Sequence, residues 1–110
     1  MNAYKKYIAE LVGTFALVFI AAGSLCADFS LRQTGAQGLG LLGTSIAYGV
    51  VVTAVIYAIS YISGSHVNPA VTISFWLTKR MEPNTAVMYI VSQIAGASLA
   101  GLALKILFPD

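Results

Sequence analysis

Three long apolar stretches, separated by polar segments, follow one another along the 110-residue chain. The first spans residues 7–26 and contains one charged side chain, Glu10, whereas the second, residues 41–62, contains none. The third covers residues 83–108 and opens with Pro83, which suits a first helical turn because its missing N–H group needs no partner there. A helix of about 20 residues crosses a hydrocarbon core of about 30 Å. The pattern therefore predicts three membrane-spanning helices and no second domain.

The two segments between these stretches predict different structures. Residues 27–40, ADFSLRQTGAQGLG, are rich in polar residues and glycine, which is typical of a loop. Residues 63–79 begin with SGSHVNPAVT, in which Asn68 is a favoured N-cap and Pro69 a favoured first helical residue. A helix from Pro69 to Lys79 would be about 16 Å long, half of the bilayer core, and it is too apolar to lie in water.

This short helix and the residues before it are therefore expected inside the membrane. Non-helical backbone is tolerated there only where protein buries it or where it lines a water-filled cavity. We expect residues 63–68 to dip to mid-membrane and the half-helix to return to the side from which the chain came. The predicted fold class is an all-α membrane protein with three transmembrane helices and one re-entrant half-helix.

A signal peptide is the alternative interpretation of the first apolar stretch. Lys5 and Lys6 precede it, and small residues surround Cys26. The stretch is, however, longer than a typical apolar signal segment of about 7 to 15 residues, and Glu10 interrupts it. A membrane span is the better interpretation.

Composition excludes several other function classes. Hydrophobic residues make up 58% of the chain and charged residues 9%, a balance typical of membrane proteins. The net charge is +2 with no basic run longer than a pair, so nothing predicts nucleic-acid binding. The single cysteine, Cys26, excludes an intramolecular disulfide and a thiolate cluster for a metal. No cofactor and no enzymatic activity are predicted.

Basic residues near the predicted spans fall unequally on the two sides of the membrane. With the N-terminus inside, four lie on the cytoplasmic side and two outside, namely Lys5, Lys6, Lys79 and Arg80 against Arg32 and Lys105. Short cytoplasmic segments carry an excess of Lys and Arg. The sequence thus predicts a multi-pass membrane protein with a cytoplasmic N-terminus.

The stretch SGSHVNPAVT resembles the first of the two signature loops of the aquaporin and glycerol-facilitator family, the major intrinsic proteins. Residues 9–19, AELVGTFALVF, resemble the first helix of that family with its buried glutamate, and residues 89–97, YIVSQIAGA, its third helix with its glutamine. The family has six spans in two inverted halves, whereas residues 1–110 resemble the first half alone. The second Asn-Pro-Ala loop and the selectivity arginine that follows it are absent from this sequence.

The loop offers the hydrogen-bonding groups that a water path requires. If Asn68 caps the half-helix with its side-chain oxygen, its amide NH2 stays free to donate to a passing water. An extended segment before it could present carbonyl acceptors, and the helix N-terminus adds about half a positive charge that repels cations. Plain helix capping is the alternative role of Asn68. The resemblance implies a pore-lining role for seven residues of the loop and motif: Gly64, Ser65, His66, Val67, Asn68, Pro69 and Ala70.

Three further polar residues have competing interpretations. His66 could bind a metal, but no second His and no Cys lie near it in the sequence, so a hydrogen bond that fixes the loop is favoured. Glu10 suggests a proton relay, as intramembrane carboxylates do by default, yet no second carboxylate or base is evident within the spans. The resemblance implies instead that Glu10 and Gln93 support the loop through hydrogen bonds.

Tyr48 precedes Asn68 by twenty residues, the separation at which the second helix of the family places an aromatic residue in the selectivity constriction. The resemblance therefore implies a selectivity-filter role, and an interface tyrosine is the alternative. Water channels of the family usually carry Phe at this position and glycerol facilitators Trp, so Tyr48 does not decide between the two solutes.

We therefore expect a membrane channel protein that forms one half of an aquaporin-type pore for passive water transport. The first alternative is a facilitator of glycerol or other small neutral solutes. The second is a non-conducting membrane protein that associates with other helices. A pore of the family needs two half-helices that meet from opposite sides, so we expect an oligomer with an inverted copy or a complementary C-terminal half.

Overall fold

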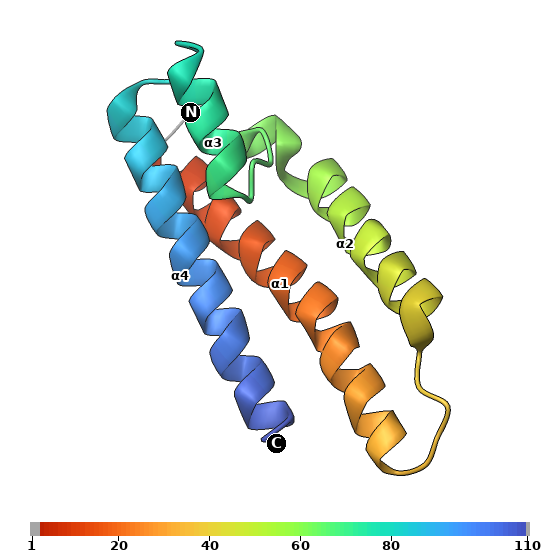
Figure 1. Ribbon diagram of the computed structural model, residues 1–110. Coiled ribbons are helices and arrows are strands. Elements are labelled where there is room, and N and C mark those ends of the chain that lie inside the picture. The colour runs from red at the N-terminus through yellow and green to blue at the C-terminus, as the bar shows by residue number, and fades with distance from the viewer. Residues whose placement is uncertain (1–2, 110) are drawn as a thin grey trace.

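The computed structural model describes residues 3–109 and is helical throughout its regular structure. Its helices are α1 (Ala3–Gln33), α2 (Gly40–Ser63), α3 (Pro69–Leu77) and α4 (Pro83–Leu107). Three of them, α1, α2 and α4, are long and apolar enough to cross a membrane. Figure 1 shows α1 between α2 and α4, with the short α3 at the end where α1 begins and α2 ends. The predicted fold class, three spans and one short helix, is confirmed.

The first helix is longer than predicted, and the predicted loop at 27–40 was wrong in its extent. Residues 27–33 continue α1, which leaves 34–39 as the connection. Asp28 explains the difference, because its Oδ1 accepts the N–H groups of Leu39 at 2.7 Å and Gly40 at 2.9 Å. Residues 27–33 therefore form the final turns of α1, and Asp28 in these turns binds the backbone at the start of α2.

The half-helix ends two residues earlier than predicted, at Leu77. Thr78 caps it through a backbone N–H bond to the carbonyl of Ser74 at 3.1 Å. Lys79 then takes a left-handed conformation, with φ +63°, and turns the chain toward α4. A left-handed residue cannot continue a right-handed helix, so the basic pair lies in the turn and not in the helix.

Close contacts of α1 with its two neighbouring helices depend on two glycines, one on α1 and one on α4. A Cβ at Gly13 would lie 2.6 Å from Cδ1 of Ile59 on α2, and one at Gly96 on α4 would overlap the carbonyl oxygen of Leu11. Small residues allow this approach between membrane helices, where packing rather than water drives association. The contacts lock α2 and α4 against the first half of α1.

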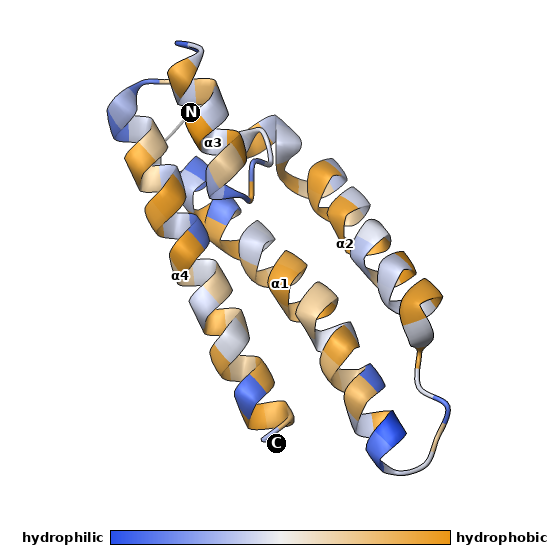
Figure 2. Cartoon of the chain, in the orientation of Figure 1, coloured by the Kyte–Doolittle hydropathy of each residue, from blue (hydrophilic) through white to orange (hydrophobic). Residues whose placement is uncertain are grey.

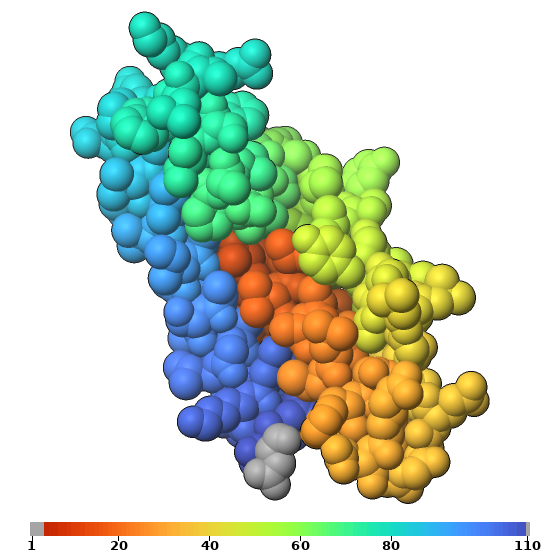
Figure 3. Space-filling view, in the orientation of Figure 1, coloured from red at the N-terminus to blue at the C-terminus, as the bar shows by residue number. Residues whose placement is uncertain are grey.

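Hydropathy is distributed as expected for a bundle surrounded by lipid. Outward-facing side chains such as Leu41, Tyr57 and Ile106 are at least 80% exposed. In Figure 2, apolar colour covers the long helices, whereas hydrophilic colour gathers where the loop before α3 lies on α1 and at the far end of α1. Figure 3 shows α3 in front of α4 above the start of α1, and this placement brings the loop onto the central helix.

Candidate functional site

Residues 64–68 form an irregular loop in which three residues have a left-handed backbone conformation. Gly64, Ser65 and Val67 have φ values of +88°, +54° and +43°, so the predicted extended segment was wrong. Left-handed residues set among ordinary ones turn successive N–H groups to one side and form a concave anion site. Non-glycine residues rarely adopt this conformation, so another part of the molecule must impose it.

Glu10 fills that concave site. Its Oε2 accepts the backbone N–H of His66 at 3.1 Å, and its Oε1 accepts that of Val67 at 2.8 Å. The Oγ of Ser63 donates to Oε2 at 2.7 Å and Nε2 of Gln93 donates to Oε1 at 2.8 Å. The side chain is fully buried and accepts four hydrogen bonds without donating one. It thus joins α1, the end of α2, the loop and α4.

Three residues that the sequence did not single out complete this polar cluster. Ser63 donates to Glu10, and its own carbonyl oxygen accepts the hydroxyl of Tyr89 at 2.6 Å. Thr72 on α3 lies between Gln93 and His66, with its Oγ1 3.0 Å from Nε2 of the glutamine and 2.9 Å from Nδ1 of the histidine. Helical spacing was an available signal for one of them, because Tyr89 precedes Gln93 by four residues and so shares its face of α4.

His66 is buried and held on two sides. Its ring packs against Phe75 at 4.5 Å and Tyr89 at 5.1 Å between centroids, while Nδ1 contacts Thr72. Within residues 3–109, no group of three or more His, Cys, Asp and Glu side chains lies together to hold a metal ion. The imidazole thus lies between the loop and both neighbouring helices, in contact with Phe75 and Thr72 of α3 and Tyr89 of α4.

Asn68 caps α3. Its backbone is extended, with φ −159°, and its Oδ1 accepts the N–H of Ala70 at 2.8 Å, while Pro69 takes the first helical position. Across residues 3–109, neither its Nδ2 nor the carbonyl oxygens of residues 64–67 take part in a hydrogen bond. Two loop N–H groups, those of His66 and Val67, thus donate to Glu10, and that of Ser65 donates to Oγ of Ser63 at 3.1 Å.

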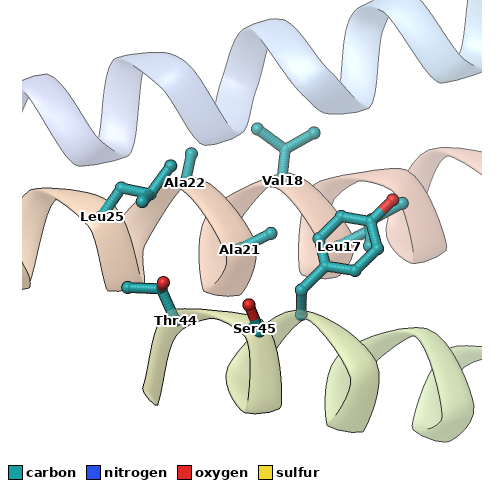
Figure 4. Close-up of a pocket in the computed structure, with 8 residues that line it drawn as sticks. Leu17, Val18, Ala21, Ala22, Leu25, Thr44 and Ser45 are labelled. Atoms are coloured by element: carbon teal, nitrogen blue, oxygen red, sulfur yellow. The ribbon is translucent and has the colours of Figure 1, made fainter. Parts of the chain in front are cut away.

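Tyr48 lies away from this cluster, fifteen residues before the end of α2. It is 54% exposed and borders a groove between α1 and α2. Figure 4 shows Leu17 and Ala21 of α1 facing Thr44 and Ser45 of α2 across this groove. The structure therefore brings Glu10, Gln93, His66 and the loop together and places Tyr48 in a separate, largely apolar groove.

Known proteins resemble this chain over nearly all of its length. A family model described as "Major intrinsic protein" matches residues 1–110. The chain is 41% identical to Aquaporin Z of Photorhabdus laumondii over 103 residues, 94% of this chain and 43% of that protein. It is 40% identical to Aquaporin Z of Bradyrhizobium diazoefficiens over 103 residues, with 94% and 42% covered. For Aquaporin NIP3-1 of Arabidopsis thaliana the identity is 38% over 104 residues, with 94% and 31% covered. The chain spans less than half the length of these curated relatives.

Proposed function

Because the chain belongs to the major intrinsic protein family and is an integral membrane protein, we propose that it forms one half of a channel for passive water transport. One observation supports this most directly. Glu10 accepts the N–H groups of His66 and Val67, whereas the carbonyl oxygens of residues 64–67 and Nδ2 of Asn68 have no hydrogen-bond partner among residues 3–109. Non-helical backbone inside a bilayer is tolerated only where protein buries it or where it lines a water-filled cavity, and the absence of protein partners for these groups favours the cavity.

The chemistry of these groups suits water. Carbonyl oxygens of residues 64–67 would accept hydrogen bonds from successive water molecules, and Nδ2 of Asn68 would donate one at the tip of α3. The α3 N-terminus adds about half a positive charge, which disfavours cations and hydronium without affecting neutral solutes. Pro69 and Ala70, the first two residues of α3, add no polar side chain at this tip.

A complete path requires a partner. The half-helix α3 offers one donor, Nδ2 of Asn68, from one side of the membrane. A complete path needs a second half-helix whose N-terminus meets α3 from the opposite side. The charge bias proposed above puts the N-terminus in the cytoplasm, so copies inserted the same way cannot supply that tip. A complementary second half, or an inverted copy, is the partner that we propose, within an oligomer.

Glycerol or another small neutral solute is the second candidate substrate. Tyr48 does not decide between water and such a solute, but the residue is 54% exposed at the groove between α1 and α2 and can therefore contact a solute there. We propose that Tyr48 narrows the path. Replacement by alanine should admit larger neutral solutes, and unchanged glycerol flux in a normally inserted Tyr48→Ala protein would exclude it from the filter.

Osmotic shrinkage of proteoliposomes, followed by stopped-flow light scattering, tests the proposal. The chain is measured alone and together with the second half of a full-length relative. Orientation is read from the accessibility of single cysteines introduced at either end of a Cys26→Ser chain. Water flux should rise only when the second half is present. Strong flux from a uniformly oriented chain alone would contradict the need for a partner, and no flux in either case would favour the non-conducting alternative.

Asn68→Asp tests the pore residue in the conducting assembly. A carboxylate at the tip of α3 should weaken cation exclusion, because it replaces a neutral donor with a negative charge. Asn84→Asp, in the first turn of α4, adds the same charge away from the loop and serves as the matched control. Equal cation permeability in both variants would contradict the assignment of Asn68 to the path.

A further inference from the structure

Thr72 forms different hydrogen bonds from the two hydroxyl residues that follow it toward the end of α3. Ser74 and Thr78 each donate to the backbone carbonyl four residues earlier, at 2.9 and 2.8 Å. The hydroxyl of Thr72 instead lies 3.0 Å from Nε2 of Gln93 and 2.9 Å from Nδ1 of His66. Because Thr72 is fully buried, these two side chains must satisfy its hydroxyl.

The amide of Gln93 reaches Thr72 with its NH2 group. Both oxygens of Glu10 already accept a backbone N–H, so the atom of Gln93 that faces Oε1 of Glu10 at 2.8 Å is a donor. The same nitrogen contacts Oγ1 of Thr72, whereas Oε1 of Gln93 is buried without a partner among residues 3–109. One hydrogen of the NH2 group thus goes to each neighbour. Thr72 accepts from Gln93, and its own proton is left for another acceptor.

The other neighbour of this hydroxyl is the imidazole of His66. A neutral imidazole has one N–H donor and one acceptor nitrogen, and the hydrogen bond at one nitrogen decides which of them carries the proton. If Nδ1 carried it, Oγ1 of Thr72 would face two donors while its own proton had no acceptor. A buried donor without an acceptor shifts such an equilibrium by about tenfold or more. Nδ1 is therefore the acceptor, and the proton is on Nε2.

Nε2 of His66 lies on the side of the ring next to the start of the loop. A Cβ added at Gly64 would lie 3.6 Å from it. Nε2 has no hydrogen-bond partner among residues 3–109, and it is not one of the buried unpaired atoms of this range. It thus reaches the molecular surface, although the residue is only 6% exposed.

We propose that Thr72 is a positioning residue that relays the direction of the Gln93 hydrogen bond to His66 and holds the imidazole as the Nε2–H tautomer. The loop then offers a side-chain N–H donor beside Gly64, in addition to the amide of Asn68 at its other end. A water molecule at this point would accept a hydrogen bond from Nε2. That contact with water rests on the proposed function, whereas the tautomer does not depend on conduction.

Nitrogen NMR of the untagged chain in lipid, with isotope-labelled histidine, reads the tautomer directly. His66 is the one histidine of the sequence, so its two ring signals need no assignment to a residue. We expect a protonated Nε2 and an unprotonated Nδ1 that accepts a hydrogen bond, with this form in at least about tenfold excess. A protonated Nδ1, with or without a protonated Nε2, would overturn the proposal.

Gln93→Glu tests the relay most sharply. Two carboxyl groups that share a site cannot both ionise, so the new group should carry a proton and donate it to Glu10. The same oxygen could then accept from Thr72, because an O–H has one hydrogen where the NH2 group has two. The hydroxyl of Thr72 would turn round and accept from His66, and we expect the imidazole proton to move from Nε2 to Nδ1. An unchanged tautomer in a folded Gln93→Glu protein would overturn the proposal.

Variants at Thr72 test the hydroxyl itself. Thr72→Ser keeps it and should leave both ring signals unchanged, whereas Thr72→Val removes it and should shift the Nδ1 signal toward that of a nitrogen without a hydrogen bond. Thr78→Val is the matched control on α3, because its hydroxyl contacts only the backbone carbonyls of Ser74 and Phe75. Equal shifts in Thr72→Val and Thr78→Val would show a general effect on the helix and would overturn the proposal.

The unaltered chain decides the tautomer even if a buried substitution prevents folding. Circular dichroism shows whether Thr72→Val and Gln93→Glu keep their helix content. The spectrum is also independent of water flux. The expected tautomer in a chain that conducts no water with its second half would support this inference and contradict the proposed function.

Discussion

Two carboxylates on α1 hold two loops by the same contact. Near the start of the helix, Glu10 accepts the backbone N–H groups of His66 and Val67. Near its end, Asp28 accepts those of Leu39 and the next residue, the first of α2. In each case one acidic side chain satisfies two backbone donors that no helix can satisfy.

The surroundings of the two carboxylates differ. Glu10 is fully buried, and Ser63 and Gln93 occupy its remaining acceptor sites. Asp28 keeps 20% of its side-chain surface exposed and pairs with Arg32, whose side chain is 56% exposed. Low dielectric strengthens hydrogen bonds and raises the cost of leaving a group unpaired, whereas water can replace a partner at an exposed site. The same contact is therefore essential to the fold at one end of α1 and replaceable at the other.

Comparing the stability losses of Glu10→Ala and Asp28→Ala is the strongest test of this contrast. Removal of Glu10 leaves the N–H groups of His66 and Val67 and the hydroxyl of Ser63 without an acceptor. Each buried unpaired donor costs about 1–3 kcal/mol, so the loss should exceed about 3 kcal/mol. Asp28→Ala should lower stability much less, because water solvates the donors of Leu39 and Gly40.

Thermal unfolding in detergent, followed by circular dichroism, measures both variants. Glu10→Gln is a useful intermediate, since it keeps the shape of the side chain but turns one acceptor into a donor that faces other donors. It should be destabilised, though less than Glu10→Ala. Equal melting temperatures for Glu10→Ala and Asp28→Ala would contradict the role given to burial.

Gly13→Ala tests whether the buried loop tolerates a small shift. Its new methyl group would lie 2.9 Å from Cγ1 of Val67, the residue whose N–H group Glu10 accepts, and 2.6 Å from Cδ1 of Ile59. Valine is stiff at χ1, so the loop backbone must move. We expect a loss of about 1–3 kcal/mol.

Gly101→Ala on α4 is the matched control, because nothing lies within 4 Å of its added methyl group. This substitution should be neutral or stabilise the helix by up to about 1 kcal/mol. A similar melting temperature for the two alanine variants would show that the loop accommodates the extra group.

Much of the fold could be predicted from the lengths of the apolar stretches. Twenty or more apolar residues specify a span, and Asn68 followed by Pro69 specifies a helix start, since both signals are local. The end of α1 was not predictable in this way. Polar residues 27–33 could be loop or helix, and the contact of Asp28 with Leu39, eleven residues later, favours the helix.

The candidate site was harder to predict than the spans. The resemblance implied that Glu10 supports the loop, but no local signal predicts left-handed backbone at Ser65 or Val67, because such residues rarely adopt it. Acceptance of the Val67 N–H by Glu10, 57 positions earlier, favours this conformation. Tyr89 was overlooked for a related reason: its spacing of four residues from Gln93 indicates a shared helix face, but its hydrogen-bond partner is a backbone carbonyl, which no residue type identifies.

Tyr89→Phe removes one hydrogen bond from the buried cluster and should have a smaller effect than the changes above. The hydroxyl donates to the carbonyl of Ser63 at 2.6 Å, and the residue is 3% exposed. Loss of one buried hydrogen bond with the ring retained should cost about 1 kcal/mol. Tyr57→Phe, at an 82% exposed position of α2, is the control and should leave the melting temperature unchanged.

Arg32→Gln should have the smallest effect on stability. It removes the ion pair with Asp28 but keeps the contacts of Asp28 with the loop backbone, so it distinguishes the contributions of the two. Nε of Arg32 lies 3.1 Å from Oδ2 of Asp28, while the loop N–H groups bind Oδ1. An exposed pair at i,i+4 often contributes nothing measurable, because water and salt screen it and the long side chain loses freedom. The melting temperature should therefore match that of the unaltered chain at both low and high salt. If Arg32→Gln lowered it as much as Asp28→Ala, the arginine rather than the two N–H contacts would hold the loop, and the two ends of α1 would no longer use the same contact.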